Sequence, residues 1–114
     1  MTRIYVPTTL HDLASHLAAG EIPGSVGGHV ADAEDEDSEY AALMNAARSS
    51  ATLLDGPGRR VVIVAERPDQ QTPSAPIPME HVVAVHADTE DRAPDDDPDD
   101  DLAWFATQEI PDLL

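Results

Sequence analysis

Carboxylates are the residues of this chain best able to do chemistry, because most of them fall in two dense runs. Six acids lie in residues 32–39 and nine in residues 88–101, which together hold 15 of the 23 acidic residues. Such runs could bind calcium, but an EF-hand loop needs oxygen ligands at its first, third and fifth positions and glycine at its sixth. A loop starting at Asp35 places Tyr40 at the sixth position, and a loop starting at Asp95 also lacks glycine there. We therefore predict no dedicated metal site.

Histidines and glycines do not form a recognisable site either. His11 and His16 lie about 140° apart around a helix, and His81 and His86 fall on opposite faces of a strand. The glycine-rich residues 24–28 lack the Lys-Ser/Thr pair of a phosphate-binding loop, and the chain has no cysteine. We predict no catalytic, cofactor-binding or metal-ligating residue, and no cofactor.

Trp104 and Phe105 are the only tryptophan and the only phenylalanine, and they directly follow the second acidic run. They could close the domain by packing on its core, which is the interpretation we favour. They could instead be displayed to a partner, with tryptophan as the binding hot spot. On that hypothesis the candidate partner-binding residues are Trp104, Phe105, Asp35, Glu36, Asp37, Asp95, Asp96 and Asp97.

The net charge is −17, with six arginines and no lysine. This charge repels nucleic-acid backbones and anionic membranes. It favours solubility, cations or a basic protein surface as the partner, and a solvated surface that keeps the protein soluble is the interpretation we favour. Concentrated charge also speeds association with such a partner and makes binding sensitive to salt. No apolar run reaches the roughly 18 residues of a membrane span, and the N-terminus lacks a signal-peptide pattern. We expect a cytoplasmic protein, and we leave its oligomeric state open.

The first half of the chain predicts a strand and two helices. A strand at residues 3–6 precedes a helix in which Leu10, Leu13, Ala14 and Leu17 share one face, capped by Thr8 or Thr9 and ended by Gly20. Residues 24–31 are a poor strand or a loop. A second helix presents Tyr40, Leu43, Ala47, Ser50 and Leu54 along one stripe and stops at Gly56.

The second half predicts two buried strands and a terminal helix. Val61–Ala65 is a β-branched run typical of a strand covered on both faces, and Val82–Val85 is a second strand. Residues 67–78 contain four prolines and form a loop. Residues 88–101 are expected to be solvated and disordered, and a short helix from about Asp101 to Glu109 follows.

The fold class is therefore α+β or α/β. The order β-α-(β)-α-β-β-α predicts a small two-layer sandwich with three to four strands and two to three helices, mainly on one face of the sheet. We assign residues 1–87 to a compact domain, 88–101 to an acidic linker and 102–114 to a terminal helix docked on that domain.

Several segments together resemble one family of uncharacterised actinobacterial proteins, a domain of unknown function. They are Arg3–Pro7 with its Leu-rich helix, Glu39–Leu43, Ala46–Arg48, Arg60–Val62, Val82–His86 and Trp104–Glu109. The Trp-aromatic-Ala-Thr-Gln-Glu block is the most specific of these. The chain departs from the family in being short between Gly20 and Asp35 and within residues 67–78. The resemblance implies a cytoplasmic actinobacterial protein and carries no activity with it.

Three functional hypotheses follow. The first is a non-enzymatic protein that acts through protein–protein contacts, with the acidic segments steering a basic partner. The second is a nucleic-acid mimic that occupies the basic groove of a DNA- or RNA-binding protein. The third is a ligand-binding or enzymatic domain with a pocket on the sheet, lined by residues such as Tyr5, His29, Tyr40 and His86.

Overall fold

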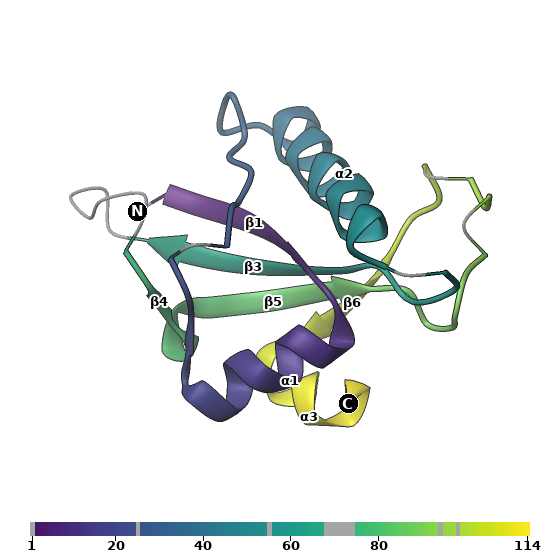
Figure 1. The fold of residues 1–114 in the computed structure, drawn as a ribbon. Helices are drawn as coiled ribbons and strands as arrows, with labels where there is room; N and C mark the ends of the chain where they lie inside the picture. Colours follow the sequence, from purple (N-terminus) through teal and green to yellow (C-terminus); the bar gives the residue numbers. More distant parts are fainter. Residues whose placement is uncertain (1, 25, 55, 68–74, 94, 98) are drawn as a thin grey trace.

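The computed structural model describes residues 2–24, 26–54, 56–67, 75–93, 95–97 and 99–114. Figure 1 shows the arrangement of its helices and strands. In chain order they are β1 (Thr2–Thr8), α1 (Leu10–Ala19), β2 (Glu21–Ile22), α2 (Glu36–Leu53), β3 (Val61–Arg67), β4 (Ile77–Pro78), β5 (Val82–Ala87), β6 (Ala103–Ala106) and α3 (Ile110–Leu113). Single turns of 3-10 helix at Met79–His81 and Thr107–Glu109 precede β5 and α3.

β1, β3, β5 and β6 form one antiparallel sheet in that order. This confirms the predicted mixed class, which is α+β with a four-stranded sheet. A second, two-residue ladder joins β2 to β4 and lies outside the predicted strands. The predicted weak strand at residues 24–31 makes one isolated bridge, between His29 and Tyr5. Of the predicted proline-rich loop, residues 68–74 lie outside the described residues, and its end forms β4.

The ends of α1 confirm the prediction made from its capping residues. The Thr9 side chain accepts a hydrogen bond from the backbone N–H of Asp12 at 3.1 Å, which satisfies one of the free donors of the first turn. Gly20 ends the helix at a φ of 79°, a left-handed conformation that glycine adopts without steric cost. Leu13 is fully buried between these caps.

α2 begins where the first acidic run supplies a cap. The Asp35 carboxylate accepts from the backbone N–H of Ser38 at 2.7 Å, and this bonding lowers the pKa of Asp35. The buried residues of the helix are mostly small, with Ala42, Ala46 and Ala47 against the sheet. Tyr40, which we predicted on the buried stripe, is instead 50% exposed.

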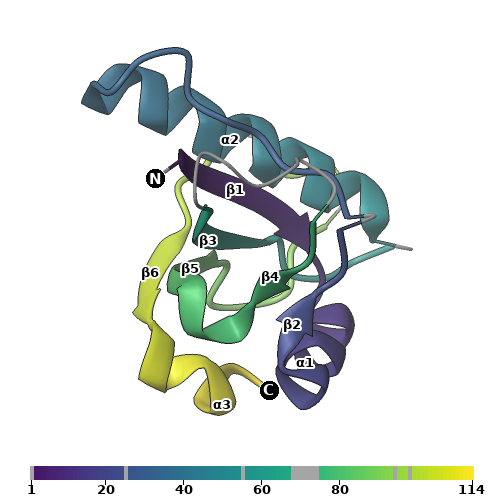
Figure 2. The same cartoon turned by 90° about the vertical axis from the view of Figure 1, so that its left-hand side faces the viewer.

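Two hydrophobic clusters cover the two faces of the sheet, whereas we predicted helices mainly on one face. The first cluster joins Val61 and Ile63 to α1, α3 and the β2–β4 ladder, and the second joins Val62 and Val64 to α2. Figure 2 shows α2 above the sheet and α1 and α3 below it. Val61–Ala65 is therefore buried on both faces, as its β-branched run predicted.

The predicted terminal helix from Asp101 to Glu109 is wrong. Ala103–Ala106 forms β6, which pairs with β5 and places Trp104 opposite His86. Aromatic residues favour strands, and a backbone edge of β5 is available to pair with this segment. The helix that does form, α3, contains Pro111 in its first turn, where a proline is tolerated because that N–H has no helical partner.

Ser50 ties α2 to the sheet through a buried hydroxyl. The backbone N–H of Val61 donates to Ser50 Oγ at 2.9 Å, and this hydroxyl donates to the carbonyl of Thr8 at 2.7 Å. Thr8 and Val61 are partners in the β1–β3 ladder. The hydroxyl therefore lies between the backbone N–H of one strand and the carbonyl of the other. Ser50 is fully buried, so water cannot replace it there.

We expect Ser50→Ala to lower the free energy of unfolding by about 1–3 kcal/mol, because it leaves a buried donor and acceptor without a partner. Urea denaturation measures the change. Thr52→Ala is the matched control, because that hydroxyl is exposed and donates to the carbonyl of Ser49 within the same helix. A change below about 0.5 kcal/mol for Ser50→Ala would contradict the bridging role.

Candidate functional site

Strand alternation separates the two aromatic residues of β6. Phe105 packs against the first hydrophobic cluster, on the side of α1 and α3. Leu102 packs against the second cluster, on the side of α2, so Trp104 two residues later lies on that same face. Trp104 is 59% exposed. Of the candidate aromatic pair, the structure thus packs Phe105 against the core and displays Trp104, where we favoured packing of both.

The indole stays exposed because α2 covers only part of its face of the sheet. α2 packs mainly on β1 and β3, and the cluster beneath it extends to Ala84 of β5 and to Leu102, which leaves Trp104 exposed at the β6 border of this face. We call this border, with His86, Trp104 and the Tyr40–Asp101 hydrogen bond beside it, the Trp104 face. Figure 2 shows the start of α2 and the start of β6 on the same side of the molecule.

His86 and Tyr40 give the Trp104 face two titratable groups. His86 is partly buried on β5, opposite Trp104, and burial lowers its pKa below the ordinary 6.5. The Tyr40 hydroxyl donates to the Asp101 carboxylate at 2.7 Å, and this hydrogen bond raises the pKa of Tyr40. Asp99 and Arg48 also lie near the Tyr40 hydroxyl, so charges of both signs border it.

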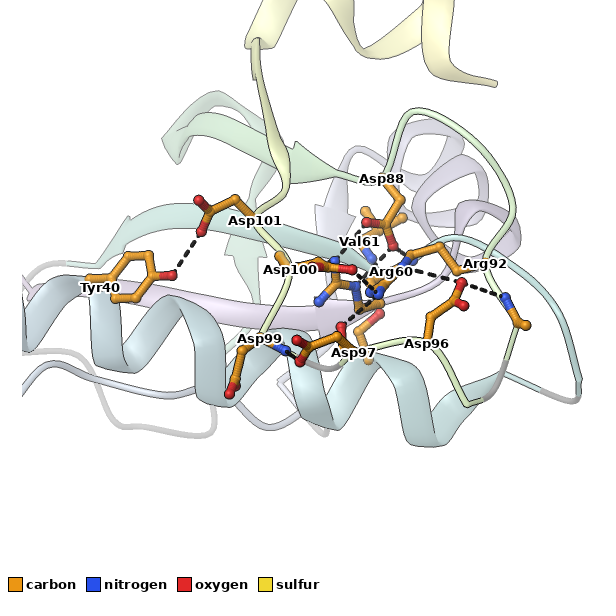
Figure 3. A network of polar contacts seen from close by, with 12 residues as sticks. Tyr40, Arg60, Val61, Asp88, Arg92, Asp96, Asp97, Asp99, Asp100 and Asp101 are labelled. Carbon is orange, nitrogen blue, oxygen red and sulfur yellow. Dashed lines mark hydrogen bonds and ion pairs between the residues drawn. The ribbon is translucent and has the colours of Figure 1, made fainter.

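A buried ion pair anchors the segment that leads to β6. Arg60 and Asp88 are 3% and 6% exposed, and the guanidinium Nη2 lies 2.7 Å from one carboxylate oxygen. The other oxygen accepts from the backbone N–H of Arg60 at 2.8 Å and from Nε at 2.9 Å. Nη2 also donates to the carbonyl of Asp100 at 2.8 Å (Figure 3). The pair therefore joins the ends of β3 and β5 to the chain just before Trp104.

The prediction that residues 88–101 are solvated is wrong for Asp88, because that residue carries the buried ion pair. The signal in the sequence was the position of the two residues. Arg60 directly precedes one of the two predicted buried strands, and Asp88 follows the other. Composition averaged over the segment hides a single buried residue at its start. Candidate site residues in this part of the chain should therefore have included Arg60 and Asp88.

Some candidate acids of the second run form hydrogen bonds and ion pairs within the chain. Asp96 accepts from the backbone N–H of Ala93 at 2.9 Å and pairs with Arg92, which also donates to the carbonyl of Asp97 at 2.6 Å. Asp95 is exposed. Among the described residues, four arginines pair with acids of this segment: Arg48 with Asp99, Arg59 with Asp91, Arg60 with Asp88, and Arg92 with Asp96 and Asp100.

The candidate acids of the first run lie at the start of α2. Asp35 caps the helix, and Glu36 and Asp37 are exposed in its first turn. Their charges are favourable next to the positive end of the helix dipole. Glu36 is one helical turn before Tyr40, whose hydroxyl donates to Asp101.

The four residues of the predicted pocket do not converge on one site: Tyr5 and His29 pair through their backbones, whereas Tyr40 and His86 border the Trp104 face. Tyr5 is buried against α2, and Tyr40 is exposed near Asp99 on another part of that helix. His29 lines a cavity of about 500 Å³ and shares a hydrogen bond of 3.1 Å with Ser49 there. His86 lies on β5. A Ser–His pair is one element of nucleophilic catalysis, but no hydrogen bond that orients the other imidazole nitrogen is found in the described ranges.

No cluster of three or more His, Asp or Glu side chains suited to a metal ion occurs in the part of the chain that the structure describes. None of the described helices has the length and apolar character needed to span a bilayer.

A family model described as a family of unknown function (DUF6912) matches residues 2–114. The chain belongs to this family. Comparisons with curated proteins and with solved structures gave no match. The function of this DUF6912 member must therefore be argued from its own residues.

The Arg60–Asp88 pair yields a stability prediction for this DUF6912 protein. Asp88→Asn removes the carboxylate charge that faces the buried guanidinium, and we expect a loss of about 3–5 kcal/mol in the free energy of unfolding. Urea denaturation measures it. The control is Asp91→Asn, which removes an exposed partner of Arg59 at 3.6 Å and should cost less than about 1 kcal/mol. Equal effects of the two substitutions would show that burial of the pair does not matter.

His86 yields a prediction of pH dependence. Burial lowers its pKa in the folded protein, so the unfolded chain binds the proton more readily. The stability that depends on neutral His86 is complete above the ordinary value of 6.5 and is lost as pH falls through the folded pKa. NMR titration of the imidazole should give a midpoint below 6.5, with the resonance assigned by its loss in His86→Gln. A midpoint at or above 6.5 would contradict the burial argument.

Proposed function

We propose that this DUF6912 protein is non-enzymatic and acts through protein contacts, with the Trp104 face as the docking site for a basic surface of a partner. The observation that carries the proposal is the 59% exposure of Trp104, the only tryptophan of the chain, beside a phenylalanine that packs inward. An exposed tryptophan has a large apolar area with few rotatable bonds, which is the usual character of an interface hot spot.

Charge around the Trp104 face supports a basic partner. Asp101 lies three residues before Trp104, and Glu36 and Asp37 lie at the start of α2 near Tyr40. The whole chain has a net charge of −17, which raises the rate of encounter with a positive surface. An arginine or lysine of the partner could also stack on the indole, a contact worth about 0.5–2 kcal/mol.

The internal ion pairs favour this proposal over nucleic-acid mimicry. A mimic must present its carboxylates to a partner's basic groove, as a phosphate backbone does. Here Asp88, Asp91, Asp96, Asp99 and Asp100 are paired with arginines of the same chain. Arginines of the chain therefore neutralise part of the second acidic run, and its buried member, Asp88, holds the chain in place before β6.

Two further proposals follow from the family resemblance. We propose an actinobacterial origin, with the Trp104–Glu109 block as the family's most specific segment. We also propose that the protein works in the cytoplasm. These proposals decide which lysate is used to test the docking site.

Affinity capture with the immobilised protein tests the proposed function. We expect an actinobacterial lysate to yield a partner at about 0.1 M salt, and we expect most of it to dissociate at about 0.5 M salt because charge attraction is screened. Trp104→Ala should reduce capture at least about tenfold, since hot-spot truncation costs about 2 kcal/mol or more. Thermal unfolding checks that the variant remains folded.

Leu53→Ala is the matched control for this experiment. Leu53 is 53% exposed, similar to Trp104, but it lies in the last turn of α2, away from the Trp104 face. Capture should be unchanged in this variant. Capture that survives Trp104→Ala, or that is unaffected by about 0.5 M salt, would overturn the proposal.

A further inference from the structure

The directions in which the backbone N–H and C=O groups of β5 point determine which backbone groups of β6 have no partner within the sheet. The N–H of Asp88 donates to the carbonyl of Arg60 at 3.1 Å, so the backbone groups of Asp88 face β3. Directions alternate along a strand, so those of Ala87 and Val85 face β6. Their partners in β6 are Ala103 and Phe105. Trp104, between these two residues, therefore directs its N–H and C=O away from the sheet.

A side-chain contact supports this direction independently. The backbone N–H of Ala106 donates to Glu109 Oε1 at 3.2 Å, so it is not part of the β5 ladder. Ala106 and Trp104 are two residues apart and share a direction. Glu109 occupies the outward donor of Ala106, whereas the outward donor and acceptor of Trp104 have no such partner in the described part of the chain.

The opposite edge of the sheet is closed by the chain itself. On β1, the N–H of Tyr5 donates to His29 and the N–H of His29 donates to Tyr5, both at 2.8 Å. This single backbone pair places the segment that contains His29 beside β1. Figure 2 shows β6 at the margin of the molecule, with no helix or strand beyond it. The sheet thus has one edge occupied at Tyr5 and one edge open at Trp104.

We propose that an extended, basic segment of a partner protein adds to β6 as a further strand, through a pair of backbone hydrogen bonds at Trp104. This inference rests on the proposed function and specifies its binding mode. Strand addition supplies affinity through the backbone, and side chains set the specificity. Arginine or lysine side chains of the added segment lie beside the indole, near Asp101 at one end of the edge and Glu109 at the other.

Charge determines the occupant of this edge. A second copy of the chain could pair with β6 by symmetry, but each copy has a net charge of −17 and brings the same acids to the contact. Like charges placed opposite one another cost free energy, while a basic segment gains it. The edge therefore favours a basic partner over self-association.

The test uses a synthetic peptide of about eight residues that alternates Val and Arg, added to the full-length protein labelled with ¹⁵N. We expect hydrogen exchange of the Trp104 backbone amide to slow at least about tenfold when the peptide is bound, because that N–H becomes hydrogen-bonded. The same peptide N-methylated at every residue keeps its charge and side chains but cannot pair as a strand. Its affinity should fall at least about tenfold.

The outcomes separate the binding mode from the proposed function. Equal affinity of both peptides, with shifts of the indole N–H but unchanged exchange of the Trp104 amide, would overturn strand addition and leave docking on the Trp104 face standing. Slow Trp104 exchange that appears with protein concentration alone, together with a dimer in sedimentation, would overturn the basic occupant in favour of a second copy. Failure of both peptides to bind would overturn strand addition, and Trp104-dependent capture would then decide the proposed function by itself.

Discussion

The buried pair between Arg60 and Asp88 is the constraint on which the second half of the fold depends. It continues the β3–β5 ladder by one more pair, with the Asp88 carboxylate accepting the backbone N–H of Arg60 where a carbonyl would otherwise do so. Isolated charges this deeply buried would be costly, but here the carboxylate accepts three hydrogen bonds, two of them from the guanidinium. Because the same guanidinium holds the carbonyl of Asp100, the acidic segment returns to the edge of β5. The formation of β6, and with it the position of Trp104, follows from that return.

The exposure of Trp104 has its physical origin in α2. The buried face of this helix consists largely of alanines, which let it approach the sheet closely, and Ser50 fixes it over β1 and β3 through the inserted hydroxyl. A helix held there cannot also cover β6. The β6 border of this face therefore stays open, and it holds the only tryptophan of the chain.

Local signals in the sequence predicted the elements that local interactions determine. Thr9 and Gly20 marked the ends of α1, and Val61–Ala65 predicted a strand buried on both faces. Residues 102–109 could not be assigned in this way, because they fit a helical stripe as well as a strand alternation. The open edge of β5 decided in favour of the strand, and a local sequence pattern does not reveal such a tertiary feature. Asp88 was missed for a related reason. A segment rich in acids is expected to be solvated, and the burial of Asp88 follows only once its partner, Arg60, is known. The sequence singled out the two aromatic residues as a pair, but the opposite environments of their side chains followed only from the register with β5.

An exposed tryptophan on an open strand edge normally favours aggregation, so its persistence here needs a physical explanation. β6 is short, and Glu109 blocks one of its outward donors. The acids at both ends of the edge repel any second copy of a chain whose net charge is −17. The same features admit a basic segment, for which the repulsion becomes attraction. Discrimination of this kind comes from penalising the wrong partner as much as from rewarding the right one. The large acid excess, beyond what the internal ion pairs use, is then a condition for displaying Trp104 as well as a source of solubility.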